Sequence, residues 1–178
     1  MNLLLVRHSE TNYNIAGLCN ADPSVDVHLS DEGILQTEIL SQVLSQIEFD
    51  TIFISELPRT KQTADIINQY HDKPIVVDRR LNDNRTGFES RPVGEWLASL
   101  EQSGDKWNSK YNDGESLAEA ASRAGEFIEY LKTLEFEKVL IVTHGFMTQA
   151  IFAKIENKSL DEASGFTLVQ GTYAEFEI

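Results

Sequence analysis

Short apolar runs alternate with helix-like patterns along this chain, and the alternation limits the folds it can adopt. Apolar runs at 3–6 and 139–142, with shorter ones at 52–54 and 75–77, are typical of strands buried on both faces. Strands that alternate with helices form a mostly parallel sheet covered by helices on both sides. We therefore predict an α/β fold, a three-layer sandwich, and the length of 178 residues favours a single domain.

The first long helix is expected after a polar loop. Ser30 is a candidate N-cap for a helix that runs to about Gln46. Apolar side chains recur at every fourth position of this helix and predict one buried stripe. The stripe consists of Leu35, Ile39, Val43 and Ile47.

The remaining elements follow from capping and alternation. Ser116 and Glu119 form a capping box at the start of a helix to about residue 134. Further helices are expected at 58–70, 95–101 and 146–155. Residues 166–169 and 172–178 alternate like an antiparallel hairpin or an edge strand. The segment 79–115 is mostly irregular, and substrate specificity and any closing lid are expected there.

Charge and cysteine usage restrict the partners and the compartment. The formal net charge is −14, from 29 acidic and 15 basic residues. Such a surface repels nucleic acid and anionic membranes, so we expect neither as a partner. Arg7 interrupts the first apolar run, so no signal peptide is expected. The single cysteine, Cys19, permits no internal disulfide, which favours a cytoplasmic location.

Two of the apolar runs end in the same way. Arg7 and His8 follow the first run, and Thr143 and His144 follow the last one. Ligands of open parallel sheets bind outside the carboxyl ends of the strands. If these two strands are neighbours, both imidazoles face one site.

Arginines are unevenly distributed in this acidic chain. Arg7 and Arg59 lie beside predicted strand ends, and four of the seven arginines fall within a short stretch, namely Arg79, Arg80, Arg85 and Arg91. Guanidinium groups near a crevice suit a small anion such as phosphate or a carboxylate. Surface ion pairs in a solvated loop are the alternative for Arg79 and Arg80.

Five blocks of sequence, in order, resemble the motifs of one family. Residues 5–14 read LVRHSETNYN, 29–36 read LSDEGILQ, and 55–64 read SELPRTKQTA. Gly114-Glu115-Ser116 with Arg123, and Thr143-His144-Gly145, complete the series. Together the blocks resemble the histidine phosphatase superfamily, the phosphoglycerate mutase-like group, across nearly the whole chain.

The resemblance implies a fold, a reaction and a site. It implies the phosphoglycerate mutase-like sandwich and transfer of a phosphoryl group through a covalent phosphohistidine on His8, since a neutral imidazole is a competent nucleophile. It assigns a phosphate pocket to Arg7, Arg59, His144 and Gly145, with Asn14 as an additional polar contact. No metal and no other cofactor are implied, because arginines supply the positive charge.

The general acid departs from the family pattern. The family usually has a glutamate two residues after a leucine that follows the third strand, and Leu81 is followed here by Asn82 and Asp83. We therefore expect Asp83 to be the proton donor, with Glu89 as the alternative. Arg85 is expected to contact substrate, or else to pair with Asp83 as an ordinary loop residue.

Two further departures affect the substrate loop. Ser9 stands where the family has a glycine, so the turn after His8 must accommodate a side chain. Cys19 and Asn20 replace the usual Gln-Gly pair, which leaves substrate contacts from that loop open.

Four functions are compatible with these motifs. The mutases of the family protect their intermediate with a long inserted segment, and residues 87–114 leave room for only a short one. We therefore expect a phosphatase that hydrolyses a small phosphorylated metabolite, a phosphate monoester. A mutase-type phosphotransferase, a phosphoprotein phosphatase and a non-catalytic phospholigand-binding regulator remain alternatives. The sequence does not indicate an oligomeric state.

Overall fold

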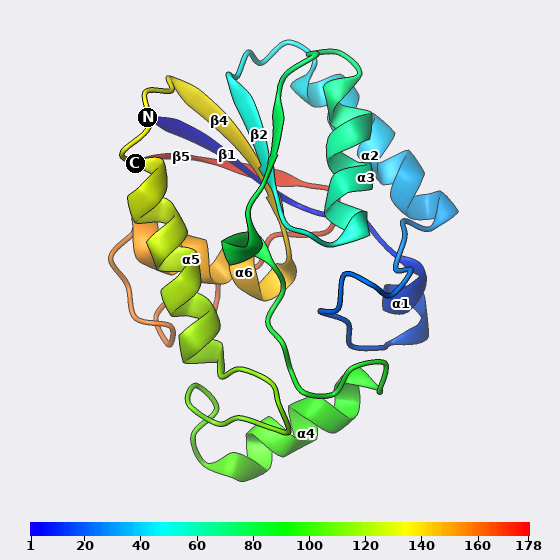
Figure 1. Ribbon diagram of the computed structural model, residues 1–178, viewed down its shortest axis with the longest axis vertical. Coiled ribbons are helices and arrows are strands. Elements are labelled where there is room, and N and C mark those ends of the chain that lie inside the picture. The colour runs from blue at the N-terminus through cyan, green and yellow to red at the C-terminus, as the bar shows by residue number, and fades with distance from the viewer.

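The computed structural model describes residues 1–178 and has a five-stranded sheet at its centre (Figure 1). The strand order is β3-β2-β4-β1-β5, in which β1 to β4 are parallel and β5 runs antiparallel to β1. The strands are β1 (Asn2–Arg7), β2 (Thr51–Ile54), β3 (Ile75–Val77), β4 (Lys138–Thr143) and β5 (Tyr173–Glu177). This topology confirms the predicted α/β fold with a mostly parallel sheet.

Helices cover both faces of the sheet (Figure 1). The helical elements of the chain are α1 (Asn12–Ala16), α2 (Asp31–Leu44), α3 (Pro58–Asn68), the 3₁₀ turn η1 (Arg79–Leu81), α4 (Val93–Ser103), α5 (Leu117–Leu131) and α6 (Gly145–Ile155). Helices α2 and α3 pack on one face of the sheet, and α5 and α6 pack on the other. The five helices expected from the sequence are all present, whereas α1 and η1 are additional.

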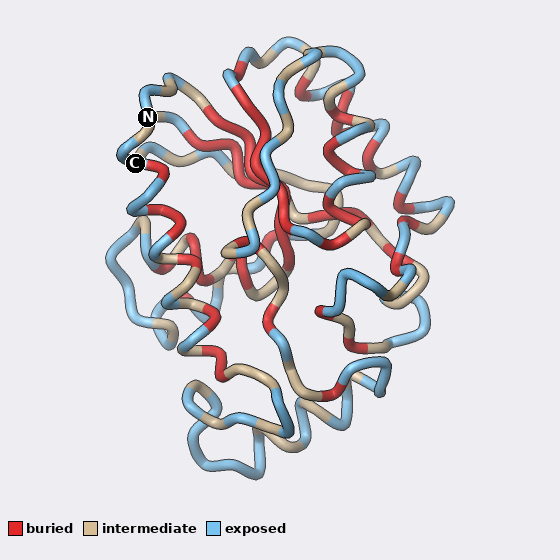
Figure 2. The backbone as a smooth tube through the Cα atoms, in the orientation of Figure 1, coloured by how far each residue is buried: buried red, intermediate tan, exposed pale blue.

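The apolar strands serve two cores at once. In β1, Leu3 and Leu5 point to the core beneath α5 and α6, whereas Leu4 and Val6 point to the core beneath α2 and α3. All four side chains are fully buried. Figure 2 shows the central strands as the most continuously buried part of the chain. A strand between two cores needs apolar residues at every position, so these runs do not alternate.

The buried face of α2 differs from the predicted stripe. Leu35, Ile39 and Val43 are 53%, 64% and 54% exposed, and only Ile47, beyond the end of the helix, packs against the core. Helix α2 instead buries Leu40 and Leu44 together with a row of small residues. The predicted stripe was therefore wrong.

Close contacts with neighbouring segments decide which face of α2 is buried. A Cβ on Gly33 would lie 2.0 Å from the Glu10 carbonyl oxygen, so only glycine fits there. Thr37 Oγ1 donates to Ser9 Oγ at 2.7 Å, and Ser41 Oγ donates to the Ile66 carbonyl of α3 at 3.0 Å. Small and hydrogen-bonding residues bring the helix close to its neighbours, which turns the larger apolar residues outward.

The C-terminal segment forms an edge strand and no hairpin. β5 pairs antiparallel with β1, whereas residues 166–169 form no strand. The Phe166 ring stacks on the Phe152 ring of α6, with centroids 4.2 Å apart. Packing against α6 therefore takes this segment away from β5.

Helix α4 lies apart from the sheet and contains no buried residue (Figures 1 and 2). Backbone hydrogen bonds hold its start: Val93 N–H donates to the Gly17 carbonyl at 2.8 Å, and Cys19 N–H donates to the Arg91 carbonyl at 2.9 Å. The position of α4 thus depends on the loop after α1. No helix of the structure combines the length and the apolar character that crossing a membrane requires.

Candidate active site

The two histidines that follow β1 and β4 lie side by side. β1 and β4 are parallel neighbours, and Arg7 pairs in register with Thr143, which places His8 beside His144. The ring centroids are 5.1 Å apart in an edge-to-face arrangement. The carboxyl edge of the sheet therefore brings the two imidazoles together.

The His8 imidazole has one nitrogen fixed and one free to act as an acceptor. Its Nδ1 lies 2.7 Å from the Ser9 carbonyl oxygen, which can only accept, so Nδ1 carries the proton. Nε2 is then unprotonated and accepts from Arg59 Nε at 3.3 Å. Burial, followed by the charges of Arg59 and Arg7, lowers the pKa of His8 well below its ordinary value. His8 is thus a neutral imidazole with a lone pair on Nε2.

His144 has the opposite arrangement of its ring nitrogens. Its Nδ1 accepts from Arg59 Nε at 3.2 Å, which leaves Nε2–H to donate to Ser55 Oγ at 2.9 Å. The side chain is fully buried, and burial followed by the Arg59 charge holds its pKa well below the usual range. Ser55, at the end of β2, has no role in the sequence analysis yet orients this ring.

Arg59 connects both histidines with the substrate loop. It is the second residue of α3, which begins at Pro58, and it is only 3% exposed. Its Nη1 donates to Asn20 Oδ1 at 2.8 Å, and its Nη2 donates to the Asn20 carbonyl at 3.0 Å. Asn20 is one of the residues that depart from the family pattern, and here it positions the guanidinium group.

Arg7 and Gly145 meet at the start of α6. Arg7 Nη1 donates to the Leu168 carbonyl at 3.0 Å, while its buried Nε has no partner in the protein. A Cβ on Gly145 would lie 3.2 Å from Arg7 Cζ, so glycine allows the close approach. No side chain caps the start of α6, and the free N–H groups of such a helix end favour an anion.

Asp83 reaches the same site from the segment after η1. Its Oδ2 lies 3.1 Å from Arg59 Nη2 and 3.8 Å from His144 Nδ1. Its Oδ1 accepts from the backbone N–H of Asn84 at 3.0 Å. Burial raises the pKa of the Asp83 carboxyl, and the Arg59 charge opposes this rise. The carboxyl therefore stands close to His144 and lines the same pocket as His8, and burial shifts its pKa toward the protonated form.

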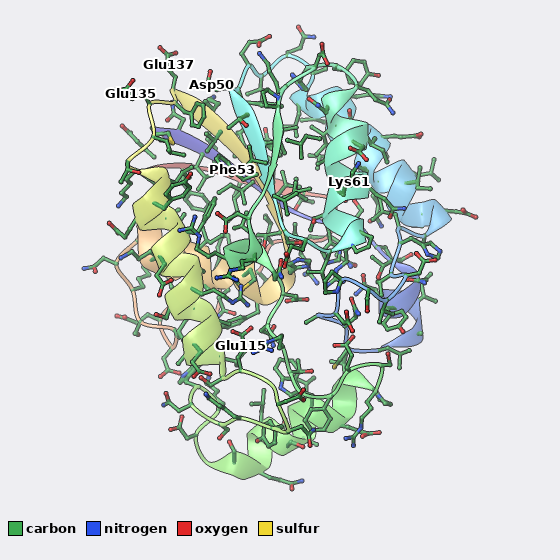
Figure 3. All side chains as sticks on the ribbon, in the orientation of Figure 1. Asp50, Phe53, Lys61, Glu115, Glu135 and Glu137 are labelled. Carbon is green, nitrogen blue, oxygen red and sulfur yellow. The ribbon has the colours of Figure 1, made fainter.

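Arg123 of α5 fixes the backbone around Asp83. Its guanidinium donates to the carbonyls of Asn82 and Asp83, at 2.8 and 3.1 Å. Glu115, labelled in Figure 3 below the carboxyl ends of the strands, pairs with the same guanidinium at 2.7 Å. This ion pair explains the Gly-Glu-Ser…Arg block: it supports the loop that presents Asp83.

Glu89 and Arg85 lie outside this group. The Glu89 carboxylate accepts from Asn20 Nδ2 at 2.6 Å and from the Ala21 N–H at 2.9 Å, so it is occupied in the loop. Arg85 lines cavities on the far side of that loop and does not reach the histidines' pocket. Of the two candidates for the general acid, only Asp83 is beside His8 and His144.

Asn14 caps the start of α1 and also lines the pocket. Its Oδ1 accepts from Thr11 N–H at 3.1 Å in the capping box of α1 and from Gln170 Nε2 at 2.7 Å. Its Nδ2 forms no hydrogen bond within the protein, and the side chain lines the cavity beside His8.

A pocket of about 280 Å³ opens above His8, whereas His144 is fully buried and does not line it. Its floor consists of His8, Arg7, Arg59, Asp83 and Gly145, and polar side chains of Asn14, Asn20, Asn84 and Thr86 line it as well. Its outer wall contains apolar and aromatic residues that the sequence analysis did not assign to the site. They are Tyr13, Leu18, Val27, Val93, Trp96 and Phe146. Only the packing of α1 and α4 over the sheet edge reveals them.

Comparison with known families agrees with this geometry. The profile of the Histidine phosphatase superfamily (branch 1) matches residues 3–178. The chain belongs to this superfamily. The match spans almost the whole chain, and it confirms the resemblance carried by the five sequence blocks.

Relatives within the histidine phosphatase superfamily include several phosphatases. Fructose-2,6-bisphosphatase TIGAR of Xenopus tropicalis is 36% identical over 76% of this chain, and the chain spans about half (51%) of that relative's length. Adenosylcobalamin/alpha-ribazole phosphatase of Salmonella typhimurium is 28% identical, with 100% of this chain and 91% of the relative covered.

Solved structures of the superfamily share the whole fold. The alpha-ribazole phosphatase of Shigella flexneri superposes with a TM-score of 0.90 at 25% identity, covering 100% of this chain and 91% of that one. YhfR of Bacillus stearothermophilus superposes with a TM-score of 0.87 at 26% identity, covering 99% and 91%.

Proposed function

We propose that this protein is a metal-independent phosphatase that hydrolyses small phosphate monoesters through a phosphohistidine on His8. The observation that carries the proposal is the unprotonated Nε2 of His8, held toward a pocket between the guanidinium groups of Arg7 and Arg59. Membership of the histidine phosphatase superfamily and the phosphatases among its relatives support it.

The phosphate group would bind where positive charge and free donors converge. Arg7 and Arg59 supply the charge, and the buried Nε of Arg7 has no partner in the protein. The Gly145 end of α6 and the free amide of Asn14 would add hydrogen bonds, and His144, which is fully buried, would act by holding Arg59 Nε. Preorganised donors of this kind stabilise the charge that spreads over the equatorial oxygens of a transferring phosphoryl group.

In the first step, His8 Nε2 attacks phosphorus and the bond to the ester oxygen breaks. The departing alkoxide takes a proton from the Asp83 carboxyl, so the alcohol leaves neutral and Asp83 becomes a carboxylate. The raised pKa of Asp83 suits this donor role. The product of the step is a phosphoryl group on Nε2 of His8.

In the second step, water attacks the phosphohistidine. Asp83, now a carboxylate, accepts a proton from that water, while the P–N bond breaks and Nε2 recovers its lone pair. Inorganic phosphate leaves, and Asp83 is again protonated. No metal ion enters either step, because Arg7 and Arg59 provide the positive charge.

The substrate is expected to be a small phosphorylated metabolite in the cytoplasm. Two relatives are named as a fructose-2,6-bisphosphatase and an alpha-ribazole phosphatase. Both names refer to small phosphate esters as substrates of those proteins. The net charge of −14 disfavours nucleic acid and anionic membranes as partners. We further propose that residues 1–178 act as one domain, in which the 79–115 segment selects the substrate.

Phosphate release from an aryl phosphate, with chelator present, tests the proposal. Wild type should turn over, and His8→Ala should not. Brief reaction with ³²P-labelled ester should leave an acid-labile, base-stable label on wild type, as expected for a phosphohistidine. A wild-type protein that binds vanadate but releases no phosphate would favour the alternative of a non-catalytic phospholigand-binding regulator. Transfer to an added alcohol in excess of release would favour a phosphotransferase.

A further inference from the structure

The outer part of the catalytic pocket points to the kind of alcohol that the substrate carries. We infer that the site prefers monophosphate esters of flat, apolar alcohols and that it has no receptor for a second phosphate group. This inference rests on the proposed function and names its substrate class. It also bears on the clustered arginines, for which the sequence left two roles open: binding an anion of the substrate, or forming surface ion pairs.

Charge is confined to the floor of the pocket. Arg7 and Arg59 are the only cations that line it, and both are close to the histidines. Both would be engaged by the phosphoryl group that is transferred. A second phosphate on the same substrate would therefore meet no unused cation within the pocket.

The wall above that floor combines apolar side chains with the polar side chains of Asn14, Asn20, Asn84 and Thr86. Leu18 lies in the loop after α1, Val93 and Trp96 lie in the first turn of α4, and Phe146 lies in the first turn of α6. Aromatic and branched side chains from three elements thus surround the space that the alcohol would occupy. Flat apolar groups gain from burial and from stacking against such rings, whereas polyols and anions do not.

Backbone hydrogen bonds within the protein hold part of this wall in place. The loop after α1 and the start of α4 form a short antiparallel ladder, with a bridge between Leu18 and Pro92. Three backbone hydrogen bonds flank this bridge, at 2.8 to 2.9 Å: Val93 N–H to the Gly17 carbonyl, Cys19 N–H to the Arg91 carbonyl and Ser90 N–H to the Cys19 carbonyl. A preorganised wall spends less binding free energy on ordering, so its shape contributes to selectivity.

The four clustered arginines face elsewhere. Arg79, Arg80 and Arg85 line a neighbouring cavity, and Arg80 is paired there with Asp78 at 2.6 Å. Arg91 is paired with Glu95 on the surface of α4.

Carboxylates balance the arginines of that neighbouring cavity. Its lining includes four arginines, with Arg123 among them. Besides Asp83, the proton donor of the proposed mechanism, it includes four acidic residues, namely Glu56, Asp78, Glu115 and Glu126. The cavity therefore has no excess of positive charge with which to bind a second anion.

Binding of non-hydrolysable phosphonates tests the inference without turnover. By titration calorimetry, benzylphosphonate should bind at least about tenfold tighter than methylphosphonate. Propane-1,3-bisphosphonate should bind no tighter than propylphosphonate. Equal affinity for the benzyl and methyl compounds, a gain from the second phosphonate, or no binding of any of them would overturn the inference.

The two tryptophans of the chain provide a matched pair of variants. Trp96→Ala should remove most of the benzyl preference, and Trp96→Phe should restore much of it because a ring is retained. Trp107→Ala is the control, since Trp107 donates to Asp161 at 3.0 Å outside the pocket. If Trp107→Ala lowers the preference as much as Trp96→Ala, the assigned wall is wrong. Phe146→Leu gives a second test of the wall on α6, independent of Trp96.

Failure of this inference differs from failure of the proposed function. Protein that binds benzylphosphonate with the predicted preference but shows no His8-dependent phosphate release contradicts the phosphatase and supports the wall. Protein that hydrolyses esters through His8 with no preference for aryl compounds, or with a preference for bisphosphates, contradicts the wall and supports the phosphatase.

Discussion

Two neighbouring cavities of this protein are lined by arginines, and they differ in what faces each guanidinium group. In the catalytic pocket, Arg59 donates to two imidazoles, an amide and Asp83. In the neighbouring cavity, Arg80 is held by the Asp78 carboxylate at 2.6 Å and lies over the Tyr130 ring.

The two carboxyl groups that face these arginines have pKa values shifted in opposite directions. Burial tends to raise the pKa of Asp78, but hydrogen bonds from Arg80 bring it below the ordinary value. The pKa of Asp83 is raised, because burial outweighs the attraction of Arg59. Asp78 thus neutralises its arginine, whereas the raised pKa makes the Asp83 carboxyl easier to protonate, so that it opposes the charge of Arg59 less fully. Arginine content alone does not identify a phosphate site; the partner of each arginine does.

The largest expected effect is the loss of the nucleophile in the catalytic pocket. His8→Ala should lower kcat by at least about a thousandfold, because Nε2 of His8 is the atom on which the proposed covalent intermediate forms. Phosphate-release assays measure this loss. Vanadate binding and circular dichroism serve as controls that the pocket and fold persist. Substantial residual turnover by His8→Ala would show that the pocket around His8 is not the catalytic one.

Removal of the proton donor should have an effect that depends on the leaving group. Asp83→Asn should lower kcat/KM for alkyl phosphates by about 10²–10⁴, since the alkoxide then leaves unprotonated. For p-nitrophenyl phosphate, whose leaving group needs no proton, the loss should be far smaller. Glu89→Gln is the matched control, because Glu89 accepts hydrogen bonds within the loop and lines no part of the pocket. Equal losses for both esters would exclude Asp83 as the acid.

The pH dependence of kcat/KM should report the protonation of the Asp83 carboxyl. The pKa of His8 is well below its ordinary value, so His8 stays neutral to a lower pH than a free imidazole would. The pKa of Asp83 is raised, so the fraction of Asp83 that carries the required proton grows as the pH falls. For an alkyl phosphate, kcat/KM should therefore increase toward acid pH, and Asp83→Asn should flatten this increase. An unchanged slope in Asp83→Asn would assign the titration to another group.

Arg59 should tolerate no substitution by another cation. Lysine keeps the charge but cannot contact both imidazoles, Asn20 and Asp83 at once, so Arg59→Lys should lower kcat by about a hundredfold. Steady-state kinetics with an aryl phosphate measure this. A rise in KM with kcat unchanged would indicate that Arg59 contributes only to binding of the substrate in its ground state.

The smallest effect is expected in the neighbouring cavity. Arg85 lines that cavity and no part of the catalytic pocket, so Arg85→Ala should change kcat/KM by no more than about twofold. The measurement should include a monophosphate and a bisphosphate ester. A selective loss of bisphosphate hydrolysis would show that the two cavities act together, contrary to the distinction drawn above.

Much of the fold follows from local sequence. The apolar run of β1 has no polar position between residues 3 and 6, because each face of the sheet has its own core. The helix starts at Ser30 and Ser116 follow from side chains that accept from their own first turns, at Gly33 and Glu119. These interactions span few residues, so the sequence contains nearly all the information they need.

Local patterns in the sequence were enough to predict the strands, the helix starts and the motif residues that meet at the ends of β1 and β4. Only the tertiary structure decided which face of α2 is buried, because Gly33 must approach the Glu10 carbonyl. It also decided that Asp83, and not Glu89, lies beside the histidines, and that Trp96 lines their pocket while Arg85 does not. The physical reason is range: capping and strand burial act between near neighbours in the chain, whereas counter-charges and pocket walls come from segments that meet only after folding.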